Sequence, residues 1–211
     1  MTSGSADIAG IILCGGRSSR MGGGDKSLLT LAGSTILSRI IGRLEQIHPL
    51  AISANGDPSR FSDFGLPILA DTVPGFAGPL AGILAGMQWA IEQGHGRLLT
   101  VAGDTPFFPI TLADRLVEAA AASPASIAVA ASNGRRHPVF ALWPTALRDD
   151  LRRFLTEAKT SRVNSFIDMH DPIDVDFPLI ACDGRSIDPF FNVNTPQDLA
   201  EAGRIAQMFD P

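Results

Sequence analysis

Short apolar runs alternate along this chain with longer stretches in which apolar residues recur at helical spacing. Residues 8–14 form one such run, which ends in glycines, as is typical of a buried parallel strand. Residues 50–54 and 97–102 are two more short apolar runs. Helical periodicity begins near Ser34, where one face carries the apolar residues Ile36, Leu37, Ile40, Ile41, Leu44 and Ile47.

The remainder of the chain continues this alternation. Further extended segments are predicted over residues 127–131 and 138–142. The other predicted helices are residues 78–93, 111–122, 147–155 and 195–208, the last with Pro196 at its first position. Alternating strands and helices build βαβ units, so we predict an α/β fold with a mostly parallel central sheet and helices on both faces. Ligands of such folds bind beyond the carboxyl ends of the strands.

The length and composition of the chain indicate a globular protein and exclude several other classes of protein. A chain of 211 residues fits one α/β domain or two very small ones, and its 45% hydrophobic content is that of a globular protein. The formal net charge of −5 argues against non-specific binding of nucleic acid. No signal peptide or membrane-spanning run is apparent, and Cys14 and Cys182 are best interpreted as buried free thiols. A cytoplasmic location is therefore expected.

The segment after the first strand is rich in glycine and carries two spaced cations. Residues 13–26 read LCGGRSSRMGGGDK. Glycines allow the backbone to approach a ligand and to point several N–H groups at one anion. Arg20 and Lys26 add the positive charge that a triphosphate requires. This segment therefore favours a phosphate-binding loop over a surface loop without function.

Two well-known phosphate loops do not match this segment. A P-loop has glycine directly before its Lys-Ser pair, whereas Asp25 precedes Lys26 here. A dinucleotide fingerprint needs G-x-G-x-x-G leading into a helix, and Gly15-Gly16 lacks that spacing. The loop is therefore neither a P-loop nor a dinucleotide fingerprint.

The loop resembles the L-A-G-G-x-S-x-R-M-G-x-D-K signature of nucleoside-triphosphate transferases, in the form carried by molybdenum cofactor guanylyltransferases, with Cys14 in place of the alanine. The resemblance implies one Rossmann-like nucleotidyltransferase domain over residues 1–211, with a nucleotide half at about 8–110 and an acceptor half at about 111–200. It implies a GTP site that includes Leu13, Cys14, Gly15 and Gly16, with Arg20 and Lys26 on the phosphates as catalytic residues.

Asp104 follows the apolar run 97–102, where this fold class places its ligands. Taken alone it could be an ordinary turn residue. Mg²⁺ prefers one or two carboxylates together with substrate phosphates. The resemblance implies that Asp104 is the magnesium ligand, a catalytic residue and a contact to GTP.

Three more residues are candidates for binding GTP. Asn55 follows the run 50–54 and could read a base edge or occupy a left-handed turn before Gly56. The resemblance implies that Asn55 and Asp71 contact the nucleotide. Gly78 opens the predicted helix 78–93, whose N-terminus could hold an anion, while Gly82 and Gly86 within it could instead serve close packing.

The acceptor side is marked by two later segments. His137 lies in Arg-Arg-His-Pro before a predicted strand, and Asn192 and Asn194 lie in Asn-Val-Asn-Thr-Pro. Both segments resemble parts of the molybdopterin guanylyltransferases, in which the Asn-x-Asn-Thr-Pro stretch flanks the pterin side. Asparagine side chains could match pterin donors and acceptors. The alternatives are a structural histidine and an asparagine that belongs to the turn before the last helix.

The resemblance implies Mg²⁺-dependent transfer of GMP from GTP to the terminal phosphate of molybdopterin. We further expect a monomer that binds neither nucleic acid nor membranes. Proteins that deliver molybdopterin or mature molybdoenzymes are expected partners. The phosphate acceptor is already ionised near neutral pH, so no Ser-His-Asp set is required, and none is apparent in the sequence. Alternatives are a molybdopterin cytidylyltransferase, another sugar or cofactor nucleotidyltransferase, and a non-catalytic nucleotide-binding module.

Overall fold

A computed structural model of the chain describes residues 7–15, 25–73, 78–158, 160–182 and 184–209. One seven-stranded sheet with the strand order β5-β4-β1-β6-β8-β7-β9 is its centre. The strands are β1 (Ile8–Leu13), β4 (Leu50–Ser53), β5 (Ile68–Leu69), β6 (Arg97–Ala102), β7 (Ala128–Ser132), β8 (Arg135–Pro144) and β9 (Ile173–Asp176). Only β8 runs antiparallel to its neighbours in this sheet. The predicted mostly parallel sheet is therefore confirmed.

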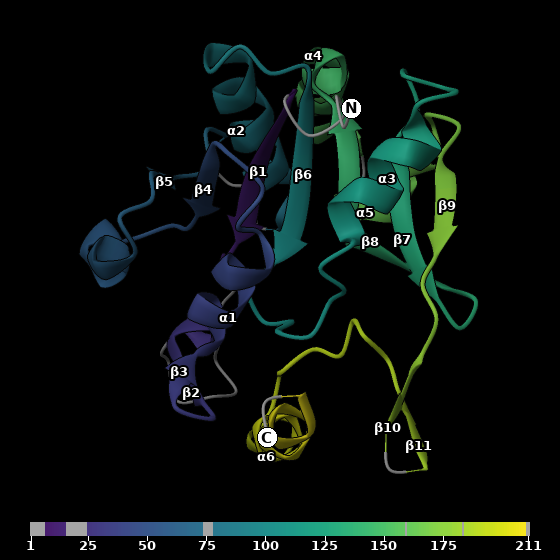
Figure 1. The fold of residues 1–211 in the computed structure, drawn as a ribbon. Helices are drawn as coiled ribbons and strands as arrows, with labels where there is room; N and C mark the ends of the chain where they lie inside the picture. The colour runs from purple at the N-terminus through teal and green to yellow at the C-terminus, as the bar shows by residue number, and fades with distance from the viewer. Residues whose placement is uncertain (1–6, 16–24, 74–77, 159, 183, 210–211) are drawn as a thin grey trace.

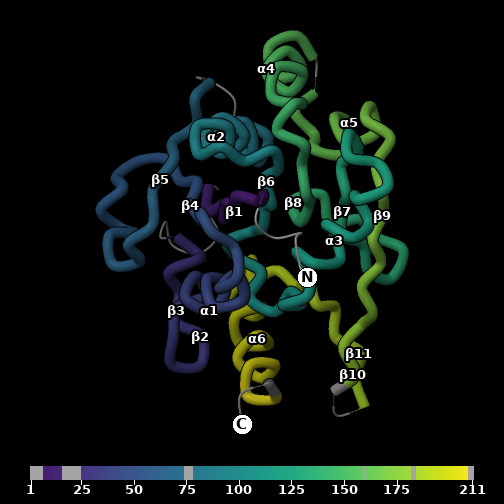
Figure 2. The backbone as a smooth tube through the Cα atoms, turned by 45° about the horizontal axis from the view of Figure 1, so that its top comes forward, coloured from purple at the N-terminus to yellow at the C-terminus, as the bar shows by residue number. Residues whose placement is uncertain are grey.

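Helices cover both faces of the sheet, as predicted (Figures 1 and 2). One face packs against α1 (Ile36–Arg43) and α3 (Leu112–Ala120) in one apolar core. Helix α6 (Pro196–Phe209) adds apolar side chains to the same core and lies beyond the carboxyl ends of the strands, next to β2 (Thr30–Leu31) (Figure 1). The other face packs against α2 (Pro79–Glu92), α4 (Arg148–Glu157) and α5 (Val163–Ile167) in a second core. The sheet thus buries apolar side chains on both of its faces, which explains why its strands read as continuous apolar runs.

Besides the central sheet and its helices, the described residues form small hairpins and short 3₁₀ helices. The small hairpins are β2 (Thr30–Leu31) with β3 (Ser34–Thr35), and β10 (Ile180–Cys182) with β11 (Arg185–Ile187). The 3₁₀ helices are η1 (Lys26–Leu28), η2 (Pro58–Phe64) and η3 (Thr145–Leu147). Several of these elements lie close to the carboxyl ends of the strands, where ligands of this fold class bind.

Helix α2 lies against the sheet at very close range because it carries glycines on its buried face. A Cβ atom at Gly82 would lie 2.6 Å from Ser53 Oγ. A Cβ atom at Gly86 would lie 2.9 Å from both Ile11 Cδ1 and Leu98 Cδ2. The packing interpretation of these two glycines is therefore confirmed.

The first helix is shorter than its periodicity predicts. Helix α1 ends at Arg43, while Leu44 and Ile47 are buried in the loop beyond it. The start is fixed by Thr35, whose Oγ1 accepts a hydrogen bond of 3.0 Å from the backbone N–H of Ser38. Apolar spacing continued past the helix because the loop also faces the core.

The register of the parallel strands brings three loops to one edge. Leu13 at the end of β1 pairs with Ser53 of β4 on one side and with Ala102 of β6 on the other. The residues that follow these three strands therefore emerge side by side. This edge is where the sequence places the candidate residues Cys14, Asn55 and Asp104.

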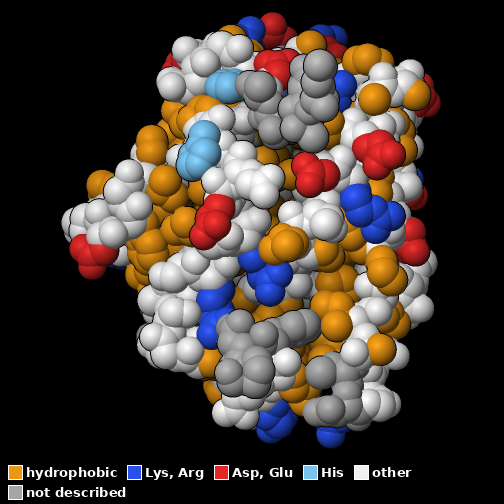
Figure 3. Space-filling model, viewed as in Figure 1, with side chains coloured by type: hydrophobic (Ala, Val, Ile, Leu, Met, Phe, Trp, Pro, Cys, Tyr) orange, Lys and Arg blue, Asp and Glu red, His pale blue; other side chains and the backbone are white. Residues whose placement is uncertain are grey.

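Charged side chains of both signs are interspersed over the face shown in Figure 3, with hydrophobic side chains between them. Among the described residues, no helix combines the length and the apolar character needed to cross a bilayer.

Candidate active site

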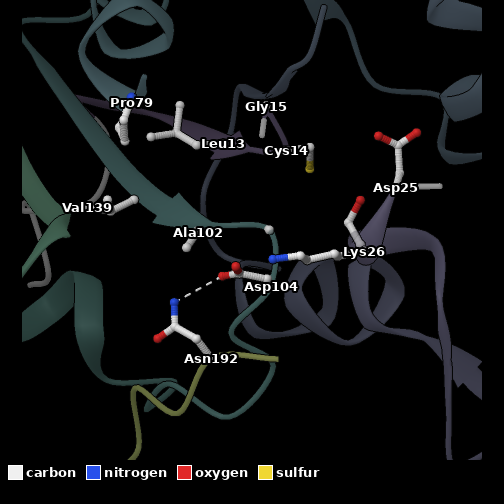
Figure 4. Close-up of a pocket in the computed structure, with 12 residues that line it drawn as sticks. Leu13, Cys14, Gly15, Asp25, Lys26, Pro79, Ala102, Asp104, Val139 and Asn192 are labelled. Carbon is white, nitrogen blue, oxygen red and sulfur yellow. Dashed lines mark hydrogen bonds between the residues drawn. The ribbon is translucent and has the colours of Figure 1, made fainter. Parts of the chain in front are cut away.

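A pocket opens at the carboxyl ends of β1 and β6 (Figure 4). Six residues that the sequence singled out contribute to its wall, namely Leu13, Cys14, Gly15, Lys26, Asp104 and Asn192. The other lining residues are Asp25, Ser27, Pro79, Ala102, Gly103 and Val139. The structure therefore joins the glycine-rich segment, the strand-end aspartate and one acceptor-side asparagine in a single cavity.

Asp104 is held at the pocket by the chain on both sides of it. The preceding Gly103 donates its N–H to the Leu13 carbonyl at 2.9 Å, and the Asp104 carbonyl accepts from the N–H of Val193 at 2.8 Å. Thr105 Oγ1 and Asn192 Nδ2 each donate to Asp104 Oδ1 at 3.2 Å. Both of these side-chain hydrogen bonds end on the same oxygen, which leaves Oδ2 for another partner.

Burial raises the pKa of the Asp104 carboxyl above its ordinary value, and the positive charge of Lys26 acts in the opposite direction. Figure 4 shows the Lys26 ammonium pointing toward the Asp104 carboxylate. A half-buried carboxylate of this kind gains from any cation that approaches it. The site therefore favours a positively charged ligand or metal beside Asp104.

Lys26 is positioned from the opposite end of the chain. Its Nζ donates a hydrogen bond of 2.7 Å to Oδ1 of Asn194. Asn194 itself is fixed because Asp198 Oδ2 accepts from the backbone N–H groups of Asn194 and Thr195 at 2.9 and 2.8 Å. Asn194 therefore belongs to the turn before α6 and also contacts Lys26, which is predicted to bind the phosphates.

Asn55 and Asp71 form a pair at the ends of neighbouring strands. Asn55 Nδ2 donates to Asp71 Oδ2 at 2.6 Å, and the Asp71 backbone N–H donates to Asn55 Oδ1 at 3.0 Å. The amide is therefore engaged with the other predicted nucleotide contact. Gly78 lies directly before α2 with a φ of 141°, a backbone conformation that suits glycine.

His137 lies at the same edge of the sheet but is buried in a polar network. Its Nε2 lies 2.7 Å from Ser132 Oγ, which donates to Asp188 Oδ1 at 2.9 Å, and its ring stacks on Phe190 at 4.4 Å. Burial lowers the pKa of His137, while Asp188 opposes this shift. This environment favours a structural role for His137.

A serine, a histidine and an aspartate meet in this network, but their order is not that of a catalytic triad. The Ser132 hydroxyl lies between the other two groups and is completely buried. A catalytic triad instead places the histidine between the serine and the acid, with the serine facing substrate. The network therefore supports the segment that carries Asn192 and does not constitute a nucleophile.

Cys14 also departs from the sequence interpretation, because its side chain lines the pocket and is only partly buried. Burial raises the pKa of its thiol to about 12, so the thiol stays neutral at physiological pH. Gly16 and Arg20 lie outside the described residues, as do all of residues 16–24. No cluster of three or more His, Cys, Asp or Glu suited to a metal occurs within the described part of the chain.

Gly103→Ala is expected to lower stability, because a Cβ there would lie 2.7 Å from Cys14 Sγ and 3.1 Å from the Leu13 carbonyl oxygen. Such overpacking costs about 1–3 kcal/mol, which is about 2–12 °C in Tm for a chain of this size. Thermal denaturation of the purified variant measures this. Adding Cys14→Ala removes the sulfur and should recover part of the loss; an undiminished Tm for Gly103→Ala would contradict the packing argument.

Sequence reasoning missed several lining residues. Asp25 and Ser27 line the pocket on either side of Lys26, so their position next to this predicted phosphate contact could have revealed them. Val139 reaches the pocket because β8 pairs antiparallel with β6, a long-range arrangement that no local pattern indicates.

The fold is that of nucleotidyltransferases of known structure. The structure superposes on molybdopterin-guanine dinucleotide biosynthesis protein A from Archaeoglobus fulgidus with a TM-score of 0.69, at 19% identity, over 94% of this chain and 98% of that one. The sequence matches the MobA-like NTP transferase domain over residues 10–173, and the chain belongs to this family.

Two curated relatives extend the match over almost the whole chain. Molybdenum cofactor guanylyltransferase of Mesorhizobium japonicum is 58% identical over 95% of this chain and 97% of its own length. The protein of the same name from a Bradyrhizobium species is 46% identical over 96% of this chain and 95% of its own length.

Proposed function

We propose that this protein transfers GMP from GTP to the terminal phosphate of molybdopterin, releasing pyrophosphate and forming molybdopterin guanine dinucleotide. The observation that carries the proposal is the junction of Lys26 and Asp104 with Asn192 and Asn194 at the carboxyl edge of the sheet. Residues expected on the nucleotide side and on the acceptor side are thus within hydrogen-bond distance of each other. The extensive identity to named guanylyltransferases supports the choice of substrates.

In the proposed reaction, an oxygen of the molybdopterin phosphate attacks the α-phosphorus of GTP. The bond from that phosphorus to the β-phosphate oxygen breaks, and the electron pair leaves with pyrophosphate. Because a phosphate monoester is ionised near neutral pH, the acceptor needs no strong general base. The main barrier is the approach of two anions, which the Lys26 ammonium reduces by preorganised charge. Arg20 is proposed to contribute in the same way.

Mg²⁺ is the metal that this donor set fits. It binds through one or two carboxylates together with substrate phosphates and water, so the carboxylate of Asp104 together with the phosphates would be sufficient. Burial raises the pKa of that carboxyl, and side-chain hydrogen bonds occupy one of its oxygens, so a cation at the other would relieve unfavourable desolvation. Mg²⁺ bound there would neutralise charge on the phosphates.

The remaining contacts are assigned by their position around the pocket. The backbone of Leu13, Cys14 and Gly15 is proposed to hold the base, with Gly16 completing the loop. The Asn55–Asp71 pair and Gly78 are proposed to line the nucleotide site further along the same edge. Asn192 and Asn194 are proposed to face the pterin phosphate once GTP has bound, with His137 behind them.

Pyrophosphate release in the presence of Mg²⁺ and purified molybdopterin, with GTP, CTP and ATP compared in parallel, tests the proposal. We expect acceptor-dependent turnover with GTP alone. Preference for CTP would indicate a molybdopterin cytidylyltransferase, and turnover only with a sugar phosphate would replace the acceptor. Tight GTP binding without any pyrophosphate release would indicate a non-catalytic module. Omission of Mg²⁺ with excess chelator should abolish turnover.

The monomeric state, the cytoplasmic location and contact with proteins that deliver molybdopterin or receive the product stay predictions.

A further inference from the structure

Arg60 joins two of the loops that surround the proposed nucleotide site. Its Nη2 donates to the Asn55 carbonyl at 2.6 Å, and its Nε donates to the Asp57 carbonyl at 2.8 Å. Its Nη1 forms an ion pair with the carboxylate of Asp25. A single guanidinium therefore contacts both the segment after β4 and the segment that leads into Lys26.

The position of Arg60 is fixed by its own helix. Asp57 caps η2, since its carboxylate accepts from the N–H of Ser59 at 2.9 Å and from the Ser59 hydroxyl at 2.7 Å. Phe61 anchors the helix in the core with no exposed surface, and the Arg60 guanidinium lies 5.2 Å from the centroid of its ring. The arginine is thus held by its neighbours before any ligand binds.

Asp25 places a carboxylate in the pocket that needs a positively charged partner. Its side chain is only 15% exposed, lines the pocket and directly precedes Lys26. An unpaired carboxylate at this position would repel the phosphates of a nucleotide and weaken the effect of Lys26. Pairing with Arg60 cancels that charge and at the same time fixes the backbone at the start of η1.

The contacts of Arg60 also reach a third strand. The carbonyl that accepts from Arg60 belongs to Asn55, and the side chain of Asn55 is paired with Asp71 beyond β5. The chain of contacts therefore runs Asp25–Arg60–Asn55–Asp71 along the edge formed by β1, β4 and β5. None of the roles assigned above includes Arg60 or Asp25.

We propose that Arg60 is a positioning residue of the nucleotide site, which neutralises Asp25 and ties the start of η1 to the segment after β4. The inference rests on the proposed function in that a nucleoside triphosphate is the ligand. Arg60 acts on binding through Asp25 and Asn55, whereas the reacting atoms lie beside Lys26 and Asp104. Its loss should therefore raise KM for GTP and leave kcat nearly unchanged.

Titration calorimetry with Mg²⁺ and GTP, without acceptor, tests this on the full-length protein. Arg60→Gln is expected to raise the Kd for GTP by about tenfold, which corresponds to the loss of one partly buried charge interaction. Asp25→Asn alone should stay within about threefold of wild type, because only a paired charge is removed. The double variant Arg60→Gln/Asp25→Asn should recover most of the affinity that Arg60→Gln loses.

The matched control is Arg153→Gln on α4, because Arg153 pairs with Asp150 at 2.6 Å in an exposed ion pair outside the pocket lining. It should bind GTP like wild type. Unchanged GTP affinity in Arg60→Gln would overturn this inference but not the proposed function. A double variant that binds GTP as weakly as Arg60→Gln would overturn the charge argument. A wild-type protein that binds no GTP overturns the proposed function and, with it, this inference.

Discussion

Asp104→Asn is expected to lower guanylyl transfer by about a thousandfold or more at every Mg²⁺ concentration, because a neutral amide cannot replace the carboxylate that we propose holds Mg²⁺. The amide has nearly the same shape and can keep an oxygen toward Thr105 and Asn192, which both donate to Asp104 Oδ1 at 3.2 Å. The loss should therefore reflect charge and metal binding. Steady-state pyrophosphate release over a range of Mg²⁺ measures it.

The same substitution should leave the protein as stable as wild type, or more stable. Burial raises the pKa of Asp104, so the folded state holds its proton more tightly than the unfolded state does. Above that raised pKa, ionised Asp104 therefore opposes folding, and its cost grows as pH rises through the interval between the two pKa values. A neutral asparagine removes this cost, so the Tm of Asp104→Asn should equal or exceed that of wild type at neutral pH.

Together these two outcomes separate a catalytic role from a structural one. Asp150→Asn is the control, because Asp150 is a carboxylate of α4 that pairs with Arg153 away from the pocket. It should retain full turnover. Near-normal turnover of Asp104→Asn at saturating Mg²⁺ would refute the metal role, and a large fall in its Tm would mean that the carboxylate is needed for folding.

Much of the fold could be predicted because its core elements carry long, regular patterns. The strand 97–102 was predicted with the bounds that β6 has, and the helix 78–93 differs from α2 by one residue at each end. Most of their residues are buried, so most positions carry the apolar signal. Strand β5 is only Ile68–Leu69, and such a short element offers no periodicity to detect.

The candidate site likewise has a part that the sequence predicts and a part that only the structure shows. The residues around Leu13 and Asp104 could be found because they follow directly on buried strands, where an α/β sheet binds its ligands. Asn192 and Asn194 were candidates as well, but the contacts that they make with Asp104 and Lys26 could not be predicted, because the partners come from distant parts of the chain. Asn192 and Asp104 are 88 positions apart, and Arg60 and Asp25 are 35 apart. Only the folded sheet brings such residues together.

Lys26→Met is expected to reduce kcat/KM for GTP by about a hundredfold to a thousandfold. The substitution keeps the length and apolar stem of the side chain but removes the charge that we propose faces the phosphates, and such preorganised charges contribute about 3–4 kcal/mol to transition-state binding. Folding should be little affected, because the hydrogen bond from Lys26 to Asn194 Oδ1 contributes only about 1 kcal/mol. Asn194→Ala removes that bond and keeps the charge, so it should cost far less in kcat/KM.

The residual activity of Lys26→Met should also show a shifted dependence on pH. The charge of Lys26 lowers the pKa of Asp104 and thereby offsets part of the effect of burial. Without it that pKa rises further, and since Asp104 must be ionised to bind a cation, the acid limb of the pH–rate profile should move to higher pH. An unshifted profile would mean that Lys26 does not act on Asp104. A variant within about threefold of wild type in kcat/KM would remove Lys26 from the mechanism.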